Sequence, residues 1–276
     1  MTRLHAITNR RARYHVGPIH LAVSVYGSAG EPVILLHGIG SRGVSWIPII
    51  DCLATRFRLI VPDLRGHGDS DKPPTGYLID DYVSDLDGLI STLGLERPMI
   101  IGHSLGALIA LYWAAKWPDR AARIVLEDPP LRPDPGAGDR FDRWLTLATT
   151  PTEVVARDLK QKHPDWSDAD CLRRAESITS TAPGVFTELR PFAMCDDREA
   201  ALARLPAVRT PILVTYGDTE AGSVVHPEDV ARVRSLLPTV TWAHIPGGGH
   251  FLHRDLTEPF LAAVLPFLHG GDGSER

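Results

Sequence analysis

Ser104 lies at the centre of the segment GHSLG (residues 102–106), which fits the pattern G-x-S-x-G. The segment directly follows a short apolar run at 98–101, which predicts a strand, and it directly precedes residues 105–117, which predict a helix. A sharp strand-to-helix turn exposes the serine hydroxyl above a sheet, and the helix N-terminus favours negative charge beside it. The sequence therefore predicts Ser104 as a nucleophile.

A general base for this serine is predicted near the end of the chain. His250 follows the glycine-rich run PGGG (246–249), next to the last predicted strand at 240–247. A glycine-rich loop at this place can bring an imidazole to the serine, and the base must reach hydrogen-bonding distance of the hydroxyl. The chain contains 12 histidines, so position rather than residue type selects His250. His253 is the alternative.

The elements that would position these groups alternate along the chain. Short β-rich runs are separated by helical patterns, which predicts an α/β fold with a largely parallel sheet covered by helices. The predicted strands lie at residues 19–26, 33–36, 57–63, 98–101, 123–128, 211–217 and 240–247. The predicted helices lie at 79–93, 105–117, from about Pro227 onward, and at 255–268.

The pattern changes between residues 129 and 207. The strand signal is lost there, and the sequence becomes rich in Thr, Asp and Arg with helical pieces. We therefore expect a core made of residues 1–128 and 208–276, with a mostly helical insertion at 129–207. With 276 residues, of which 43% are apolar, one sizeable core is expected.

Composition limits the partners and the compartment. The net charge is −5, and no basic stretch is typical of nucleic-acid binding. Arg10, Arg11 and Arg13 cluster near the start, where we expect a solvated terminus. No apolar run approaches the ~18 residues of a membrane span, and the first residues do not resemble a secretory signal. We expect a small-molecule substrate, with no nucleic-acid or membrane partner, and the sequence leaves the oligomeric state open.

The three cysteines are Cys52, Cys171 and Cys195, and they are widely separated. This spacing indicates neither a zinc site nor a disulfide framework. Free thiols fit a reducing compartment, so we expect a cytoplasmic protein. No metal-ligand cluster and no phosphate-binding G-x-x-x-x-G-K-[ST] pattern is present, and no cofactor is expected.

Taken together, several segments resemble the α/β-hydrolase superfamily. They are His37-Gly38 after a buried strand, DLRGHGDS at 63–70 after the next strand, the GHSLG turn, and Gly249-His250 near the end. The resemblance covers nearly the whole chain except the insertion. It implies the α/β-hydrolase fold, a mostly parallel central sheet flanked by helices, with a helical cap inserted after the sixth strand.

The resemblance also suggests an oxyanion hole, in which two backbone N–H groups hold the developing negative charge. Removing one such donor can cost about 3–4 kcal/mol of transition-state stabilisation. One donor is expected from Leu105, the residue after the nucleophile, and by resemblance the other comes from Ile39. The segment at 63–70 is expected to hold a loop against the core, and His67 is not expected to act as the base.

The acid that orients the histidine remains open among three residues. The family usually places it three residues after the glycine that ends the strand at 211–217, which gives Glu220 here, with Asp218 two residues earlier. Some members instead take it from the end of the preceding strand, which gives Asp128. Its role is to hold the histidine tautomer and to stabilise the imidazolium. Asp128 and Asp218 are the leading candidates.

The insertion carries aromatic and sulfur-containing side chains, most of which we expect to form its own small core: Trp144, Trp166, Phe186, Phe192 and Met194. Trp46, just after the oxyanion loop, and His103, beside the serine, are candidate substrate-binding residues. A capped apolar pocket, as the resemblance implies, suits a small and fairly hydrophobic ester, thioester or lactone. Hydrolysis would proceed through an acyl-enzyme on Ser104.

Alternative functions use the same residues. Carbon–carbon bond hydrolysis or perhydrolysis could proceed on the same triad, as in some serine relatives. A ligand-binding signalling protein that has kept its triad is an alternative from another class. By resemblance, epoxide hydrolases and haloalkane dehalogenases use a carboxylate as nucleophile, which Ser104 cannot easily replace.

Overall fold

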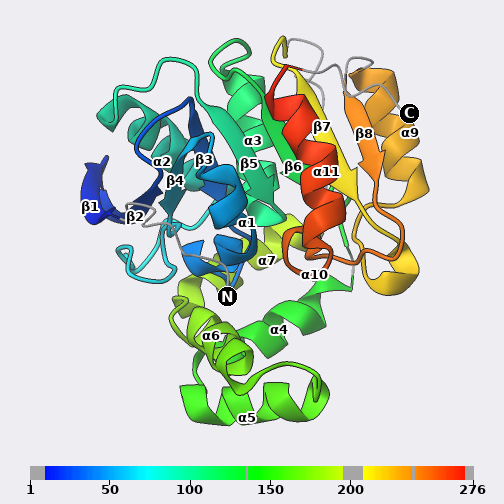
Figure 1. The fold of residues 1–276 in the computed structure, drawn as a ribbon. Coiled ribbons are helices and arrows are strands. Elements are labelled where there is room, and N and C mark those ends of the chain that lie inside the picture. Colours follow the sequence, from blue (N-terminus) through cyan, green and yellow to red (C-terminus); the bar gives the residue numbers. More distant parts are fainter. Residues whose placement is uncertain (1–9, 135, 195–207, 238–239, 271–276) are drawn as a thin grey trace.

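The computed structural model describes residues 10–134, 136–194, 208–237 and 240–270. An eight-stranded sheet runs through the centre in the order β1-β2-β4-β3-β5-β6-β7-β8 (Figure 1). Its strands are β1 Arg10–Val16, β2 Ile19–Tyr26, β3 Pro32–Leu36, β4 Arg58–Pro62, β5 Met99–His103, β6 Ile124–Glu127, β7 Ile212–Tyr216 and β8 Thr241–His244. β1, β2 and β4 pair antiparallel, and the pairs from β4 through β8 are parallel. The largely parallel sheet predicted from the sequence is confirmed.

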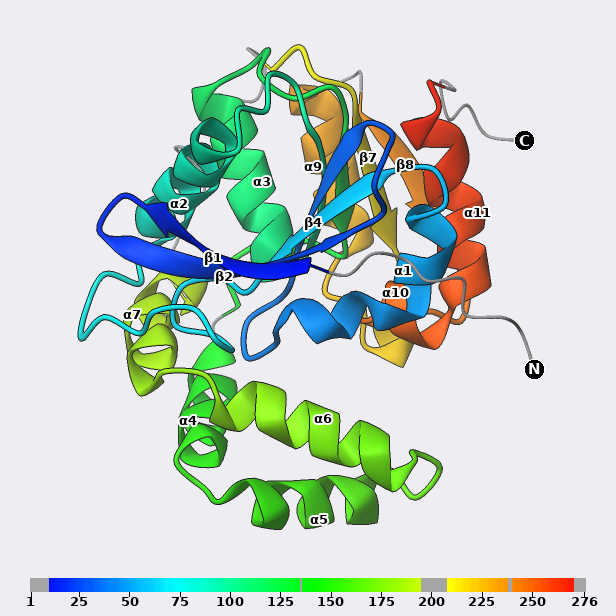
Figure 2. The same ribbon diagram turned by 60° about the vertical axis from the view of Figure 1, so that its left-hand side comes forward.

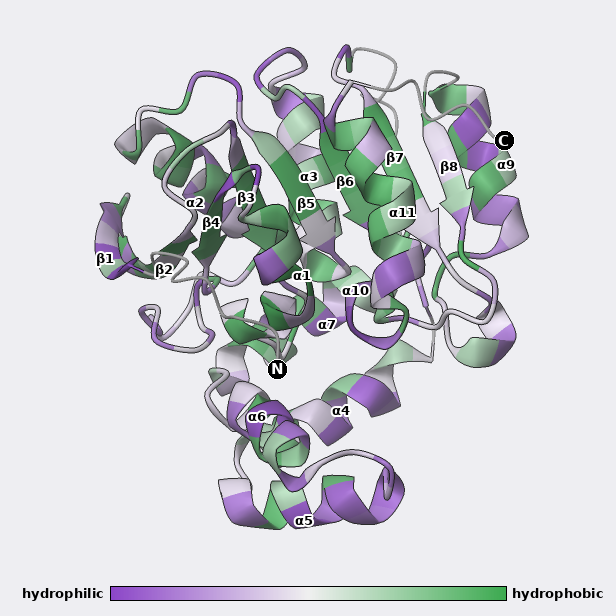
Figure 3. Ribbon diagram, in the orientation of Figure 1, coloured by the Kyte–Doolittle hydropathy of each residue, from purple (hydrophilic) through white to green (hydrophobic). Residues whose placement is uncertain are grey.

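Helices cover both faces of the sheet (Figure 1). α2 (Ile79–Thr92), α3 (Leu105–Lys116) and α9 (Pro227–Leu236) pack on one face, and α1 (Ile47–Leu53), α10 (Leu252–Asp255) and α11 (Thr257–Leu268) pack on the other. Side chains of β3 alternate between the two cores, with Ile34 in one and Val33 in the other. Continuous apolar runs, which are green in the central strands of Figure 3, thus form strands that are buried on both faces.

The segment between β6 and β7 carries four described helices: α4 (Ala137–Ala148), α5 (Thr152–Lys162), α6 (Asp168–Thr179) and α7 (Pro183–Met194). They lie together beyond one end of the sheet, with α6 between α5 and the core (Figures 1 and 2). This helical insertion agrees with the loss of strand pattern after residue 128. Cys195 and the expected boundary near residue 207 lie outside the described residues.

The arginines near the start differ from expectation, because residues 10–16 form strand β1 instead of a solvated terminus. β1 pairs with β2 along its whole length, and Arg11 forms ion pairs with Asp63 and Asp69. Alternation of charged and less polar residues at a sheet edge explains the difference, since only one face of such a strand packs on the protein. In the described part of the chain, no helix is both long and apolar enough to cross a membrane.

Candidate active site

The turn between β5 and α3 holds Ser104 in an unusual backbone conformation. Ser104 has φ 52° and ψ −112°, and among the described residues only one other non-glycine residue, Asp128, has a positive φ. Such conformations cost about 1–3 kcal/mol and persist where the surrounding structure enforces them. The sharp turn predicted from the GHSLG segment is therefore present.

Two glycines permit this turn. A Cβ atom on Gly106 would lie 2.1 Å from the carbonyl oxygen of Leu36, and one on Gly102 would lie 2.3 Å from the carbonyl oxygen of Gly106. Both distances are far below van der Waals contact with backbone atoms that cannot move freely. The first turn of α3 therefore approaches β3 and β5 more closely than any side chain at these positions would allow.

His250 contacts Asp128 in the structure. Asp128 follows β6, is fully buried, and places Oδ2 at 2.6 Å from His250 Nδ1. Two further donors hold the same carboxylate: the Ser223 hydroxyl donates to Oδ1 at 2.5 Å, and the Val224 N–H donates to Oδ2 at 2.9 Å. Together these three bonds fix the orientation of the carboxylate toward the imidazole.

The other two acid candidates lie elsewhere. Asp218 Oδ1 is 2.6 Å from His244 Nε2, and Asp218 Oδ2 accepts the Gly247 N–H at 2.7 Å. These contacts, the Gly247 bond first, lower the pKa of Asp218. Glu220 is exposed and accepts a hydrogen bond from the Thr219 hydroxyl. The structure thus brings Asp128 to His250, whereas Asp218 supports the loop that leads to His250.

Ser104 and His250 line the same cavity of about 250 Å³. Ile39 and Leu105, predicted as oxyanion-hole residues, line it as well. Its apolar wall comes largely from the helical insertion, through Phe141, Trp144, Leu189 and Phe192. Of the insertion's predicted core residues, Trp144 and Phe192 therefore face this cavity, Phe186 is buried and Met194 is exposed. Arg132, Asp134 and Arg140 supply polar groups.

The loop that carries Ile39 is held by side chains on both sides. His37 Nδ1–H donates to the Gly38 carbonyl oxygen at 2.8 Å, and this carbonyl belongs to the same peptide group as the Ile39 N–H. The Gly40 N–H donates to His67 Nε2 at 3.2 Å, and Arg174 Nη1 donates to the Gly40 carbonyl oxygen at 2.5 Å. Because a peptide group is planar, fixing the Gly38 oxygen also fixes the direction of the Ile39 N–H. Leu105 is the first residue of α3, where backbone N–H groups have no partner within the helix.

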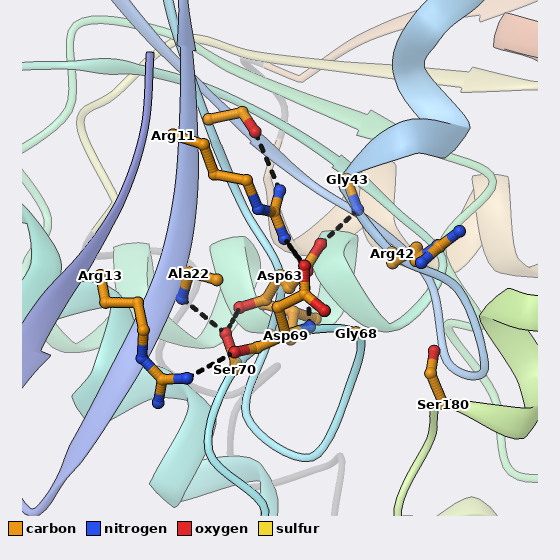
Figure 4. Close-up of polar contacts among 12 residues, drawn as sticks. Arg11, Arg13, Ala22, Arg42, Gly43, Asp63, Gly68, Asp69, Ser70 and Ser180 are labelled. Carbon is orange, nitrogen blue, oxygen red and sulfur yellow. Dashed lines mark hydrogen bonds and ion pairs between the residues drawn. The ribbon is translucent and has the colours of Figure 1, made fainter.

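The loop at 63–70 is structural, in agreement with the prediction. Asp63 accepts hydrogen bonds from Arg11, from the Gly43 N–H and from the Asp69 N–H (Figure 4). His67 is fully buried, and its burial together with the nearby His37 lowers its pKa to about 3. His67 is therefore neutral at neutral pH, and its hydrogen bonds to the Arg65 oxygen and the Gly40 N–H keep it away from the base role.

His103 and Trp46, predicted as substrate-binding residues, do not line the cavity that holds Ser104. His103 is buried, and its Nε2 lies 2.7 Å from the carbonyl oxygen of His250. Burial and the neighbouring His250 and His253 hold the pKa of His103 well below its usual range. Trp46 is fully buried and packs on His253 with 4.3 Å between ring centroids. His103 and Trp46 thus contact the segment that contains His250 and His253, and they do so outside the cavity.

His253, the alternative base, contacts a different acid. Its Nδ1 lies 2.8 Å from both carboxylate oxygens of Glu127, and its backbone N–H donates to Glu127 Oε1 at 2.9 Å. Both residues are buried. This pair ties the start of α10 to the end of β6, directly beside the Asp128–His250 pair.

Sequence reasoning did not identify Ser223, His37 or Arg174 as parts of this site. Ser223 is 95 residues from the carboxylate that it binds, and no local pattern marks the contact. His37 belongs to the His37-Gly38 pair noted in the sequence, so this motif could have indicated its bond to the Gly38 oxygen. Arg174 comes from α6 of the insertion, whose packing on the core leaves no local signal.

Comparisons with known proteins agree with this architecture. The sequence model of the family described as alpha/beta hydrolase fold matches residues 31–255. A 2-(acetamidomethylene)succinate hydrolase of Mesorhizobium japonicum is 33% identical over 93% of this chain and 94% of its own length. An N-formylmaleamate deformylase of Pseudomonas putida is 31% identical over 88% of this chain and 90% of its own length. A solved N-formylmaleamic acid deformylase of Pseudomonas putida superposes with a TM-score of 0.81 at 27% identity, covering 92% of this chain and 100% of that chain.

Proposed function

The chain belongs to the α/β-hydrolase family, and from this premise we propose that it is a serine hydrolase that cleaves a small carboxylic ester through an acyl-enzyme on Ser104. The observation that carries the proposal is the Asp128–His250 contact of 2.6 Å beside a cavity shared by His250 and Ser104. Nucleophile, base and acid of an acyl-transfer site need this arrangement.

In the proposed mechanism, Ser104 attacks the substrate carbonyl while His250 takes the serine proton. Asp128 engages His250 Nδ1, so Nε2 is the atom that accepts this proton. The negative charge that develops on the carbonyl oxygen is held by the backbone N–H groups of Ile39 and Leu105. His250 then returns the proton to the leaving alcohol, and the same histidine activates the water that releases the acyl group.

The cavity supports a small and partly apolar substrate. Its volume of about 250 Å³ and its aromatic wall leave room for a short acyl chain. The arginines in the lining have carboxylate partners, since Arg140 pairs with Asp134 and Arg132 pairs with Asp229. The apolar wall therefore carries most of the substrate contact in this proposal.

Hydrolysis of an acyl–nitrogen bond is the second candidate. The two curated relatives are named for acetamido and N-formyl compounds, in which the acyl group is bonded to nitrogen. The same triad would serve, because His250 can protonate a leaving amine as it protonates an alcohol. The difference lies in the leaving group, so a substrate panel distinguishes the two.

The test compares purified protein with Ser104→Ala on p-nitrophenyl acyl esters, matched p-nitroanilides and N-formyl amides. We expect ester turnover that falls by roughly 10⁴-fold or more in Ser104→Ala. Turnover of the nitrogen compounds alone would replace the ester by the second candidate. A vinylogous diketone acid, and peroxide with a short acid, test the carbon–carbon and perhydrolase alternatives in the same panel. Turnover unchanged by Ser104→Ala would refute the serine mechanism.

A further inference from the structure

A second cavity, of about 360 Å³, is lined by Ser41, which follows Ile39 in the same loop. Helix α6 of the insertion forms one wall through Arg173 and Arg174, and the segments around α1 and α10 form the other through Ser41 and Phe251. Ser104 and His250 do not line it. It is therefore a separate space between the insertion and the core, to which the proposed function assigns no role.

The charge of Arg174 has no carboxylate partner within the described residues. The neighbouring arginines differ in this respect, because Arg173 pairs with Asp170, Arg254 with Asp255 and Arg42 with Glu176. Burial, and then the nearby positive charge of Arg254, lowers the pKa of Arg174 to about 10. An uncompensated guanidinium in such a place gains most from an anionic ligand.

One edge of the Arg174 guanidinium has the geometry to bind a carboxylate. Arg174 donates to the Gly40 oxygen through Nη1, and in the described part of the chain Nε and Nη2 have no hydrogen-bond partner. Nε and Nη2 lie on one edge of the planar guanidinium, where two parallel N–H groups match the two oxygens of a carboxylate.

The rest of the lining is partly aromatic and apolar. Arg254 is held between two aromatic rings, 4.9 Å from the centroid of Trp166 and 4.3 Å from that of Phe251. His253 Nε2 is buried and has no hydrogen-bond partner among the residues that the structure describes. Val44, Ile47 and Pro48 add apolar surface beside these polar groups. A ligand that fits this lining has an anionic head and a short apolar chain.

We propose that this cavity is a binding site for a small carboxylate with a short apolar chain, held by the Nε and Nη2 edge of Arg174. The site depends on neither Ser104 nor the proposed reaction. Arg174 also donates to the Gly40 carbonyl oxygen. A ligand bound to Arg174 would therefore affect the position of the loop that carries Ile39.

Isothermal titration of the full chain with sodium butyrate tests the site. We expect saturable binding that weakens at least tenfold in Arg174→Gln, because glutamine lacks the positive charge that strengthens hydrogen bonds to a carboxylate. Arg143→Gln is the matched control, because Arg143 is exposed on α4 and lines neither cavity. Ile47→Glu places a negative charge on an exposed position of the lining and should also weaken binding.

Two further variants distinguish binding at this site from binding in the Ser104 cavity. Ser104→Ala and Val224→Trp, which narrows the Ser104 cavity, should bind butyrate as the natural chain does. Loss of butyrate binding in Val224→Trp, or equal affinity in Arg174→Gln and the natural chain, would overturn the proposal. If Arg174→Gln does not fold, unchanged affinity in Ile47→Glu overturns it instead. Tighter binding of inorganic phosphate than of butyrate would overturn the assignment to a carboxylate.

Discussion

At the scale of single residues, the buried carboxylate of Asp128 has three donors, and the imidazole of His250 is one of them. Asp128→Asn keeps the shape of the side chain but removes its charge. We expect kcat for the substrate found in the panel to fall by roughly 10²–10⁴-fold, because the amide stabilises neither the correct tautomer nor the imidazolium. Steady-state kinetics measure the effect, and circular dichroism checks that the fold is kept.

Asp218→Asn is the matched control for this substitution. Asp218 contacts His244 and the Gly247 N–H and does not contact His250. We expect a loss in kcat of less than about tenfold, arising from a less well-held loop. A larger loss in Asp218→Asn than in Asp128→Asn would show that the acid had been assigned to the wrong strand.

The sequence identified the pair of leading acids but could not choose between them. Asp128 and Asp218 follow β6 and β7, which are neighbouring parallel strands, so both stand at the same edge of the sheet. What favours Asp128 is its positive φ of 42° and its donors on the segment at 223–224. Neither feature has a local signature, whereas Ser104 and His250 were marked by the glycines around them.

At the scale of elements, the close approach of α3 to β3 depends on Gly106. A Cβ there would lie 2.1 Å from the Leu36 oxygen, so Gly106→Ala must displace the start of α3. We expect a loss in the free energy of unfolding of about 1–3 kcal/mol and a lower kcat, because Ser104 moves with the helix. Urea unfolding gives the first quantity and ester kinetics the second.

Gly136→Ala provides the comparison for Gly106→Ala. Gly136 has an ordinary negative φ, and the nearest atom to an added Cβ is a side-chain oxygen at 3.3 Å. We expect a change in the free energy of unfolding within about 0.5 kcal/mol. Similar losses in both variants would mean that the contact with Leu36 does not control the turn.

The helical insertion contributes the apolar wall of the Ser104 cavity, and Trp144 on α4 is its largest side chain. Trp144→Ala enlarges the cavity, so we expect kcat/KM to shift toward longer acyl chains. Each additional buried CH₂ contributes about 0.8 kcal/mol, which corresponds to a roughly fourfold gain for each carbon that the new space admits. A series of p-nitrophenyl esters measures this preference.

Trp166→Ala is the control for Trp144→Ala, since Trp166 belongs to the same insertion but lines the other cavity. It should leave the chain-length preference unchanged. An equal shift in both variants would indicate a general loosening of the insertion and would contradict the assignment of Trp144 to the substrate wall.

Elements of the core could be predicted because each combines a clear period with a clear end. The ends of β7 differ by one residue from those of the predicted strand at 211–217. The predicted helix at 79–93 starts where α2 starts and ends one residue later. β1 was missed, because its arginines and histidine hide the alternation of an edge strand. Its pairing with β2 is a tertiary effect that local propensity does not reveal.

At the scale of the whole molecule, the contact between the insertion and the core could not be predicted. Arg174 binds the Gly40 oxygen from a position 134 residues away, and Arg42 reaches Glu176 on the same helix. The sequence indicates helices in the insertion through their local patterns. It cannot place α6 against the loop that carries Ile39, because that depends on how side chains far apart in the sequence pack together.

Buried neutral histidines link the stability of the whole molecule to pH. His37, His67 and His103 are buried, and burial lowers the pKa of each, that of His67 to about 3. In the unfolded chain a histidine has a pKa of about 6.5. Below that pH the unfolded state therefore binds protons that the folded state does not, so stability is present above pH 6.5 and is lost as the pH falls.

His67→Gln tests this dependence, because glutamine has a donor and an acceptor but does not titrate. Each such histidine adds about 1.4 kcal/mol of destabilisation per pH unit between roughly pH 6 and pH 5, above the range in which most carboxylates titrate. We expect the free energy of unfolding of His67→Gln, from urea titrations at several pH values, to fall less steeply by about that amount. His15→Gln, at an exposed position of β1, should retain the slope of the natural chain. Equal slopes in His67→Gln and the natural chain would mean that His67 is protonated in the folded state, and its hydrogen bond from the Gly40 N–H could then not exist.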